Sequence, residues 1–136
     1  MISTDYNPLP APGDIVWCFF PQVLGKPGPK PRPALVLALS RTTHEVMVAY
    51  GTSQKVHKIY PTEFVIDPSD AGYAISGLSY RTKFNLADRY KLPFNSDWFG
   101  PAPGLSASSP LPKMGTLHAS YMKAVTAAQK AALQKP

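Results

Sequence analysis

Apolar residues form three short, continuous runs in the first half of the chain. The runs are at 15–20, 34–39 and 45–50, and the first of them is rich in β-branched and aromatic residues. Continuous runs of this length are typical of strands that are buried on both faces. Residues 41–44, between the second and third runs, are expected to form a hairpin connection. The pattern therefore predicts three buried strands in this half.

The hydrophobic pattern is less regular further along the chain. Residues 56–66 continue in β-forming types, with an interruption at Pro61, and residues 67–77 are typical of a turn or a short helical piece. Residues 78–86 alternate between apolar and polar types, which predicts a strand with one polar face. Residues 91–94 predict one more short strand. We therefore expect five or six strands in all.

The last part of the chain changes from a loop-like to a helical pattern. Residues 95–115 are rich in Pro, Gly and Ser and are expected to form a surface loop. Thr116 is the expected helix N-cap, and Pro136 marks the end. The positions on one helical face are Leu117, Tyr121, Val125, Ala128 and Leu133. The expected fold class is mainly β, a small barrel or half-barrel with a C-terminal helix packed across it.

Two proline-rich segments predict further boundaries along the chain. Residues 1–12 carry three of the 16 prolines and are expected to form an extended N-terminal arm, and residues 13–136 a single barrel domain. The segment 24–33 is too proline-rich to be a helix or a central strand, because proline lacks a backbone donor. It is therefore expected to be a long basic loop between the first two strands.

The charge balance favours an acidic partner. Lys and Arg outnumber Asp and Glu by 14 to 8, a net charge of +6. This imbalance fits binding of nucleic acid, RNA or DNA, but it also fits a generally basic surface. Cys18 is the single cysteine, so no internal disulfide is possible. No secretion signal or membrane-spanning run is evident, which predicts a cytoplasmic protein.

Polar and basic residues gather at the expected strand ends and in the loops between strands. They carry no spacing typical of a metal site and no phosphate-binding glycine motif, so no metal or cofactor is expected. Each also has a structural interpretation: an arginine stem covering apolar surface, a plain turn, or a solvated strand face. The candidates are Lys26, Lys30, Arg32, Thr52, Ser53, His57, Lys58, Arg81, Lys83, Asn85 and Arg89.

Several of these residues lie in segments that resemble a known family. Residues 13–17 (GDIVW), a Gly/Pro loop and residues 32–36 (RPALV) are similar to the opening of PemK/MazF-like toxins. Residues 50–54 (YGTSQ) match a strand that ends in Thr-Ser, and residues 82–86 (TKFNL) are similar to the strand that carries the family's basic and acidic pair. With the terminal helix, the resemblance covers most of residues 13–133.

The resemblance implies an SH3-like barrel, usually a homodimer, that is inhibited by a cognate antitoxin and cuts single-stranded RNA without a metal. In this chemistry the ribose 2′-OH attacks the adjacent phosphate and the 5′-oxygen leaves. The resemblance assigns phosphate binding and transition-state stabilisation to Arg32, orientation of the phosphate to Thr52 with Ser53, and proton transfer to Lys83. The surrounding basic residues are expected to contact RNA.

Asn85 is the one departure from the family pattern. It stands where other members have a carboxylate base, and a neutral amide does not accept a proton at neutral pH. His57 is an alternative base, because histidine is the residue type that most often serves as a general base in enzymes. Two other hypotheses stay open: a non-catalytic barrel that binds nucleic acid or an antitoxin-like protein, and a structural dimer whose basic charge is incidental.

Overall fold

The computed structural model describes residues 3–23, 25–102 and 111–134. Within these ranges the chain forms six strands, two single 3-10 turns and one α-helix. They are β1 (Asp14–Cys18), β2 (Arg32–Ser40), β3 (Glu45–Thr52), β4 (Glu63–Ile66), η1 (Ala74–Ser76), β5 (Thr82–Pro93), β6 (Lys113–Thr116), η2 (Ala119–Tyr121) and α1 (Met122–Leu133).

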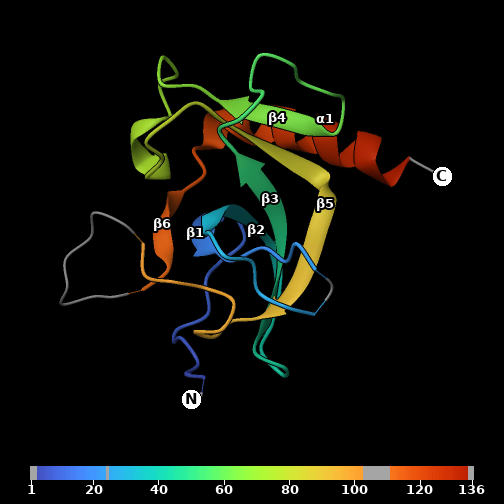
Figure 1. Ribbon diagram of the computed structural model, residues 1–136. Coiled ribbons are helices and arrows are strands. Elements are labelled where there is room, and N and C mark those ends of the chain that lie inside the picture. The colour runs from blue at the N-terminus through green and yellow to red at the C-terminus, as the bar shows by residue number, and fades with distance from the viewer. Residues whose placement is uncertain (1–2, 24, 103–110, 135–136) are drawn as a thin grey trace.

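The strands form one antiparallel sheet in the order β4-β5-β3-β2-β1-β6. The sheet curls into a half-barrel, and α1 lies across one end of it beside β4 and β5 (Figure 1). The expectation of a mainly-β fold with a C-terminal helix is therefore confirmed.

Both faces of the sheet carry a hydrophobic core. On one face, Ile15, Leu35 and Phe84 pack with Val125 and other residues of α1. On the opposite face, alternate residues of the same strands form a second cluster, in which Val16, Val36 and Val48 pack with Phe94 and Phe99. Because side chains alternate along a strand, two buried faces require the continuous apolar runs seen in the sequence.

β5 differs from the strand that the alternation predicts. The prediction placed a strand at 78–86 and another at 91–94, whereas one strand runs from Thr82 to Pro93. Gly77 has a left-handed backbone (φ 73°), so the chain is still turning just before residue 78. The pairing with β3 also shifts, from Ala49 opposite Arg89 to Tyr50 opposite Asn85. The extra residues at this irregularity interrupt the alternation of side chains, so the sequence pattern indicated two strands where there is one.

Three other boundaries differ from the prediction. Within residues 56–66 only Glu63–Ile66 is a strand. Part of the expected loop at 95–115 is β6, which pairs with β1. Thr116 belongs to β6 and is not a helix cap; instead the His118 side chain accepts a hydrogen bond from Ser120 N at the start of η2. Leu133 is exposed, and Pro136 lies outside the described residues.

The described part of the N-terminal segment lies against the sheet. Asp5 pairs with Asn95, and Tyr6 N donates to Phe94 O at 3.1 Å. The Tyr6 hydroxyl donates to Phe99 O at 3.2 Å, and a ring nitrogen of His44 lies 2.8 Å from Tyr6 O. These contacts cover the second core cluster at the end of the sheet away from the candidate residues.

Candidate functional site

The first feature of the site is a row of polar residues across three neighbouring strands. Thr52 at the end of β3 pairs with Lys83 of β5. On its other side β3 pairs with β2, where Tyr50 lies opposite Ala34. Arg32 comes two residues before Ala34 and Thr52 two residues after Tyr50, so the same register continued would set Arg32 opposite Thr52. Opposite residues of antiparallel strands point to the same face, so Arg32, Thr52 and Lys83 share one face.

Gly51 allows the strands to approach closely at this row. A side chain at this position would come within 2.6 Å of Pro33 O on β2 and within 2.6 Å of the Phe84 ring on β5. Any other residue would therefore push β2 and β5 away from β3. The close approach holds the backbone next to Arg32, Thr52 and Lys83 in fixed positions.

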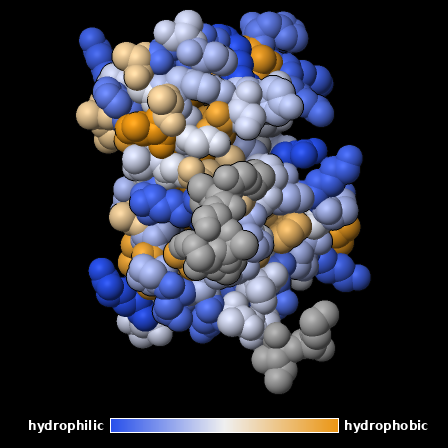
Figure 2. Space-filling model, turned by 90° about the vertical axis from the view of Figure 1, so that its left-hand side faces the viewer, coloured by the Kyte–Doolittle hydropathy of each residue, from blue (hydrophilic) through white to orange (hydrophobic). Residues whose placement is uncertain are grey.

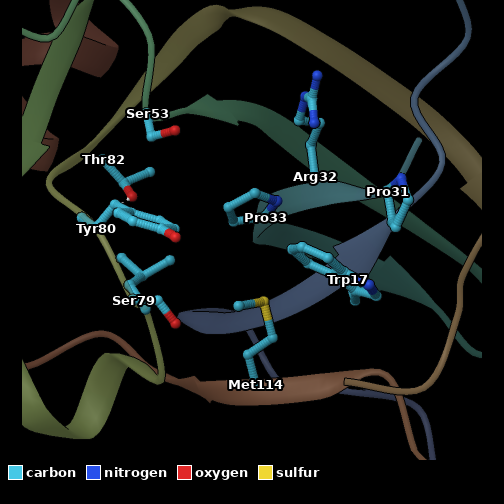
Figure 3. Close-up of a pocket in the computed structure, with 10 residues that line it drawn as sticks. Trp17, Pro31, Arg32, Pro33, Ser53, Ser79, Tyr80, Thr82 and Met114 are labelled. Atoms are coloured by element: carbon cyan, nitrogen blue, oxygen red, sulfur yellow. Dashed lines mark hydrogen bonds between the residues drawn. The ribbon is translucent and has the colours of Figure 1, made fainter. Parts of the chain in front are cut away.

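Arg32 lies at the rim of two cavities. The first, of about 180 Å³, is walled by Trp17, Pro33, Leu78, Tyr80 and Met114, with Ser53, Ser79 and Thr82 at one side. Figure 3 shows Arg32 at its edge, with the guanidinium directed away from Trp17 and Met114. The second cavity, of about 230 Å³, is more polar, and Lys30, Tyr50, Asp88 and Tyr90 line it with Arg32. Within the described part of the chain, no hydrogen bond or ion pair holds the Arg32 side chain.

Thr52 and Ser53 lie at the end of β3. The Thr52 hydroxyl accepts a hydrogen bond from Gln54 N at 3.1 Å, which fixes the turn that follows the strand. A hydroxyl has further hydrogen-bonding capacity beyond one accepted bond. Ser53 is exposed and borders the first cavity opposite Pro33 (Figure 3).

The Lys83 side chain is buried, whereas its place in the alternating pattern indicated an exposed strand face. Its Nζ donates to Lys58 O at 3.0 Å and lies 3.2 Å from a carboxylate oxygen of Glu63, and both side chains are more than 90% buried. The ammonium also lies 5.7 Å from the centre of the Tyr60 ring. The cation is therefore bound within the protein and not presented on the surface.

Asn85 is held in a similar way. Its Oδ1 accepts hydrogen bonds from the Thr62 hydroxyl at 2.9 Å and from Ala87 N at 3.0 Å. The amide thus connects the segment before β4 to the irregular part of β5. Both contacts are those of a structural acceptor.

Arg81 makes a third link to the segment between β3 and β4. Its guanidinium pairs with Asp67 at 2.6 Å and donates to Val56 O at 3.2 Å. Hydrogen bonds from the Ser69 side chain and from Arg81 lower the pKa of Asp67 to about 2. Arg81, Lys83 and Asn85 together therefore fasten residues 56–67 to β5.

The remaining candidates are exposed. His57 and Lys58 lie on the segment between β3 and β4, and Lys58 Nζ lies 5.5 Å from the Tyr60 ring centre. Lys26 and Lys30 lie on the proline-rich segment before β2, and Lys30 borders the second cavity. Arg89 lies on β5 beyond the irregularity, opposite Ala49. Ser53 and Lys30 thus border the two cavities that meet at Arg32, and Thr52 directly precedes Ser53 at the end of β3. We call this set of residues the rim.

Sequence reasoning did not single out Tyr50, Asp88 or Tyr90. Phe20 packs edge-on against both tyrosines, with ring centres 4.9 and 5.6 Å apart, and so forms the floor of the second cavity. Burial raises the pKa of Tyr90, and the neighbouring Asp88 carboxylate raises it further. The available signal was the aromatic residue at positions 50 and 90, which core packing explains equally well, and no pattern in the sequence marked Asp88.

Hydrophobic side chains are also exposed near the first cavity. Tyr80 is 70% exposed and Ile75 of η1 46% exposed. Figure 2 shows the face that carries η1 and β6, where a group of hydrophobic residues lies at the upper left among hydrophilic ones. None of the helices in the described ranges is long and apolar enough to cross a membrane. Among the same residues, no group of three or more His, Cys, Asp or Glu side chains is placed to hold a metal ion.

The fold and the site define a small, mainly-β domain with a cationic rim at the ends of β2 and β3. A family model described as PemK-like, MazF-like toxin of type II toxin-antitoxin system matches residues 11–87, more than half of the chain. The chain therefore belongs to this toxin family, as the sequence resemblance predicted.

Solved structures of similar fold carry related descriptions. An endoribonuclease in complex with its cognate antitoxin, from a mycobacterial species, is 19% identical with a TM-score of 0.58, covering 93% of this chain and 97% of that one. The Mycobacterium tuberculosis toxin MazF-mt6 is 20% identical (TM-score 0.58; 90% and 98% covered). The MazE-MazF structure from Deinococcus radiodurans is 23% identical (TM-score 0.56; 97% and 100% covered). A comparison with curated protein sequences found no significant match.

Proposed function

We propose that the protein is the toxin of a toxin–antitoxin pair and a metal-independent endoribonuclease that cleaves single-stranded RNA. In the proposed reaction the ribose 2′-oxygen attacks the adjacent phosphorus, and the bond from phosphorus to the 5′-oxygen breaks. The products carry a 2′,3′-cyclic phosphate and a 5′-hydroxyl. Family membership and the endoribonuclease descriptions of similarly folded proteins support this proposal.

The observation that carries the proposal is the environment of Arg32. Its guanidinium is not engaged by any described residue and lies at a rim shared by two cavities. An arginine offers several donors in a fixed planar arrangement that suits phosphate oxygens. Placed beside the scissile phosphate, it stabilises the charge that grows in the transition state.

The neighbouring residues support this role. Thr52, opposite Arg32, is positioned to hydrogen-bond the same phosphate, and Ser53 extends the rim. We propose that the exposed Lys26, Lys30, His57, Lys58 and Arg89 contact flanking RNA. Because Arg81, Lys83 and Asn85 are bound within the protein, we assign them to holding the segment between β3 and β4 in place and not to proton transfer.

The proposal includes a protein partner. A cognate antitoxin that covers the rim and the adjoining apolar cavity would inhibit the toxin, and the apolar residues around Trp17, Tyr80 and Met114 suit such a contact. We also propose a homodimer and a cytoplasmic location, where RNA and antitoxin are both present. Size-exclusion chromatography with light scattering distinguishes a dimer from a monomer.

The function is tested on purified protein and a long single-stranded RNA in the presence of EDTA. We expect cleavage whose upstream fragments end in a 2′,3′-cyclic phosphate, identified by mass spectrometry. The same sequence made with 2′-deoxyribose should stay intact, because it lacks the attacking group. If RNA is bound but not cut, the protein is a non-catalytic nucleic-acid-binding barrel; cleavage that stops with EDTA also contradicts the proposal.

A further inference from the structure

One carboxylate lies in the same cavity as Arg32. Asp88 lines the second cavity together with Lys30, Arg32, Tyr50 and Tyr90. Two basic residues and one acidic residue thus line the same space of about 230 Å³. A phosphate held by these cations would lie beside the carboxylate, which is therefore placed to accept a proton from the adjacent ribose hydroxyl.

The irregularity of β5 places Asp88 there. The pairing with β3 changes from Ala49 opposite Arg89 to Tyr50 opposite Asn85, so residues 86–88 have no partner on β3. The inserted residues bring Asp88 to the face that carries Tyr50 and Tyr90. Such irregularities often re-aim a side chain next to an active site.

The other carboxylates of the described residues are engaged elsewhere. Glu63, Asp67, Asp14 and Glu45 form ion pairs with Lys83, Arg81, Lys113 and Lys91. Asp70 accepts a hydrogen bond from the Tyr121 hydroxyl. Asp5 and Asp97 belong to the N-terminal segment and the segment after β5, away from the rim. Among the described residues, Asp88 is the one carboxylate that lines a cavity with Arg32.

We propose that Asp88 is the catalytic base, supplied three residues after the position where Asn85 lacks a carboxylate. This inference rests on the proposed endoribonuclease function. The Asp88 carboxylate takes the proton from the ribose 2′-OH as the bond from the 2′-oxygen to phosphorus forms. The bond to the 5′-oxygen breaks, and a water molecule donates the proton that this oxygen takes up; the hydroxide left behind takes the proton from Asp88 and so restores the carboxylate. Arg32 and Lys30 offset the phosphorane charge.

Tyr90 lines the same cavity as Asp88. Burial raises the pKa of Tyr90, and the neighbouring Asp88 carboxylate raises it further, so the hydroxyl stays protonated at neutral pH. A protonated hydroxyl in the same cavity is available as a hydrogen-bond donor, and a carboxylate has several lone pairs with which to accept hydrogen bonds.

The test measures single-turnover cleavage and RNA affinity for wild type, Asp88→Asn and Asp88→Glu. General-base catalysis contributes on the order of 10²–10⁴ in rate, so Asp88→Asn should slow cleavage at least about 10²-fold. RNA affinity should be unchanged or higher, because a negative charge is removed. Asp88→Glu keeps a carboxylate and should cleave at least about tenfold faster than Asp88→Asn. Asp97→Asn, which removes a carboxylate outside the cavity, should cleave as the wild type does.

A substrate with a sulfur atom in place of the scissile 5′-oxygen separates a base from an acid. A thiolate leaves without a proton, so it rescues a variant that lacks the catalytic acid but not one that lacks the base. The Asp88→Asn defect should therefore persist. Rescue by sulfur, an unchanged rate, or a loss explained by weaker RNA binding would each overturn the assignment. If the wild type cleaves RNA and Asp88→Asn is fully active, only the assignment of Asp88 as the base is refuted. If the wild type does not cleave RNA, the proposed endoribonuclease function is itself refuted.

Discussion

At the residue scale, Arg32 and Lys83 carry the same charge but lie in different environments. Both are basic residues on one face of the sheet, Arg32 on β2 and Lys83 on β5, and β3 lies between these two strands. The Lys83 ammonium is bound by Glu63 and Lys58 O within the protein, whereas the Arg32 guanidinium has no partner among the described residues. The cation without a partner in the described part of the chain is the one that is available to bind a ligand.

The buried pair gives a stability prediction. Lys83→Met leaves the Glu63 carboxylate buried without its cation, so we expect the free energy of unfolding to fall by about 3 kcal/mol. Lys83→Met combined with Glu63→Gln should recover most of this loss, because glutamine is neutral and still accepts the hydrogen bond from Tyr60 N. Urea denaturation measures both.

The matched control is the pair of Lys91 and Glu45, which is 3.7 Å long and whose lysine is 58% exposed. Solvent screens such a pair, so Lys91→Met should cost less than about 1 kcal/mol. Equal losses for Lys83→Met and Lys91→Met would show that the Lys83 pair has no special structural role.

At the scale of elements, the sequence predicted the strands that are fixed by continuous apolar runs. β1, β2 and β3 follow from residues 15–20, 34–39 and 45–50, because burial on both faces leaves no polar positions. β6 was missed: its four residues include Gly115, and its pairing with β1 is a long-range contact that no local pattern reveals.

The same reasoning explains what was predictable in the site. Arg32 and Thr52 adjoin strands with clear patterns, so their positions at a strand start and a strand end were predictable. Lys83 was assigned to a polar strand face, but the segment before β4 covers that face. Asp88 could not be found, because the irregularity of β5 that places it depends on the pairing with β3.

At the scale of the whole molecule, the net charge of +6 is concentrated partly on the proline-rich segment before β2. Lys26 and Lys30 are both exposed there. The affinity for RNA falls as salt rises, and each phosphate contact on a single strand contributes about 0.7 to the steepness of log affinity against log salt. If each lysine neutralises one phosphate, Lys26→Glu with Lys30→Glu should make this dependence shallower by about 1.4. A fluorescence anisotropy titration with single-stranded RNA at several salt concentrations measures the slope.

The control reverses two lysines of α1. Lys123→Glu with Lys130→Glu changes the net charge equally on an exposed element at another part of the molecule. It should lower affinity slightly and leave the slope nearly as in the wild type. Equal effects of the two double variants would mean that RNA responds to net charge alone and not to the rim.

The role of Arg32 is tested most directly by single-turnover RNA cleavage at saturating protein. Arg32→Ala should lower the rate on the order of 10²–10³-fold, because a donor to the transition-state charge is lost. The melting temperature should stay close to that of the wild type, since the guanidinium stabilises no described contact. Arg41→Ala in the exposed hairpin between β2 and β3 should retain full activity. Full activity of Arg32→Ala, with the fold intact, would contradict an active site at this rim.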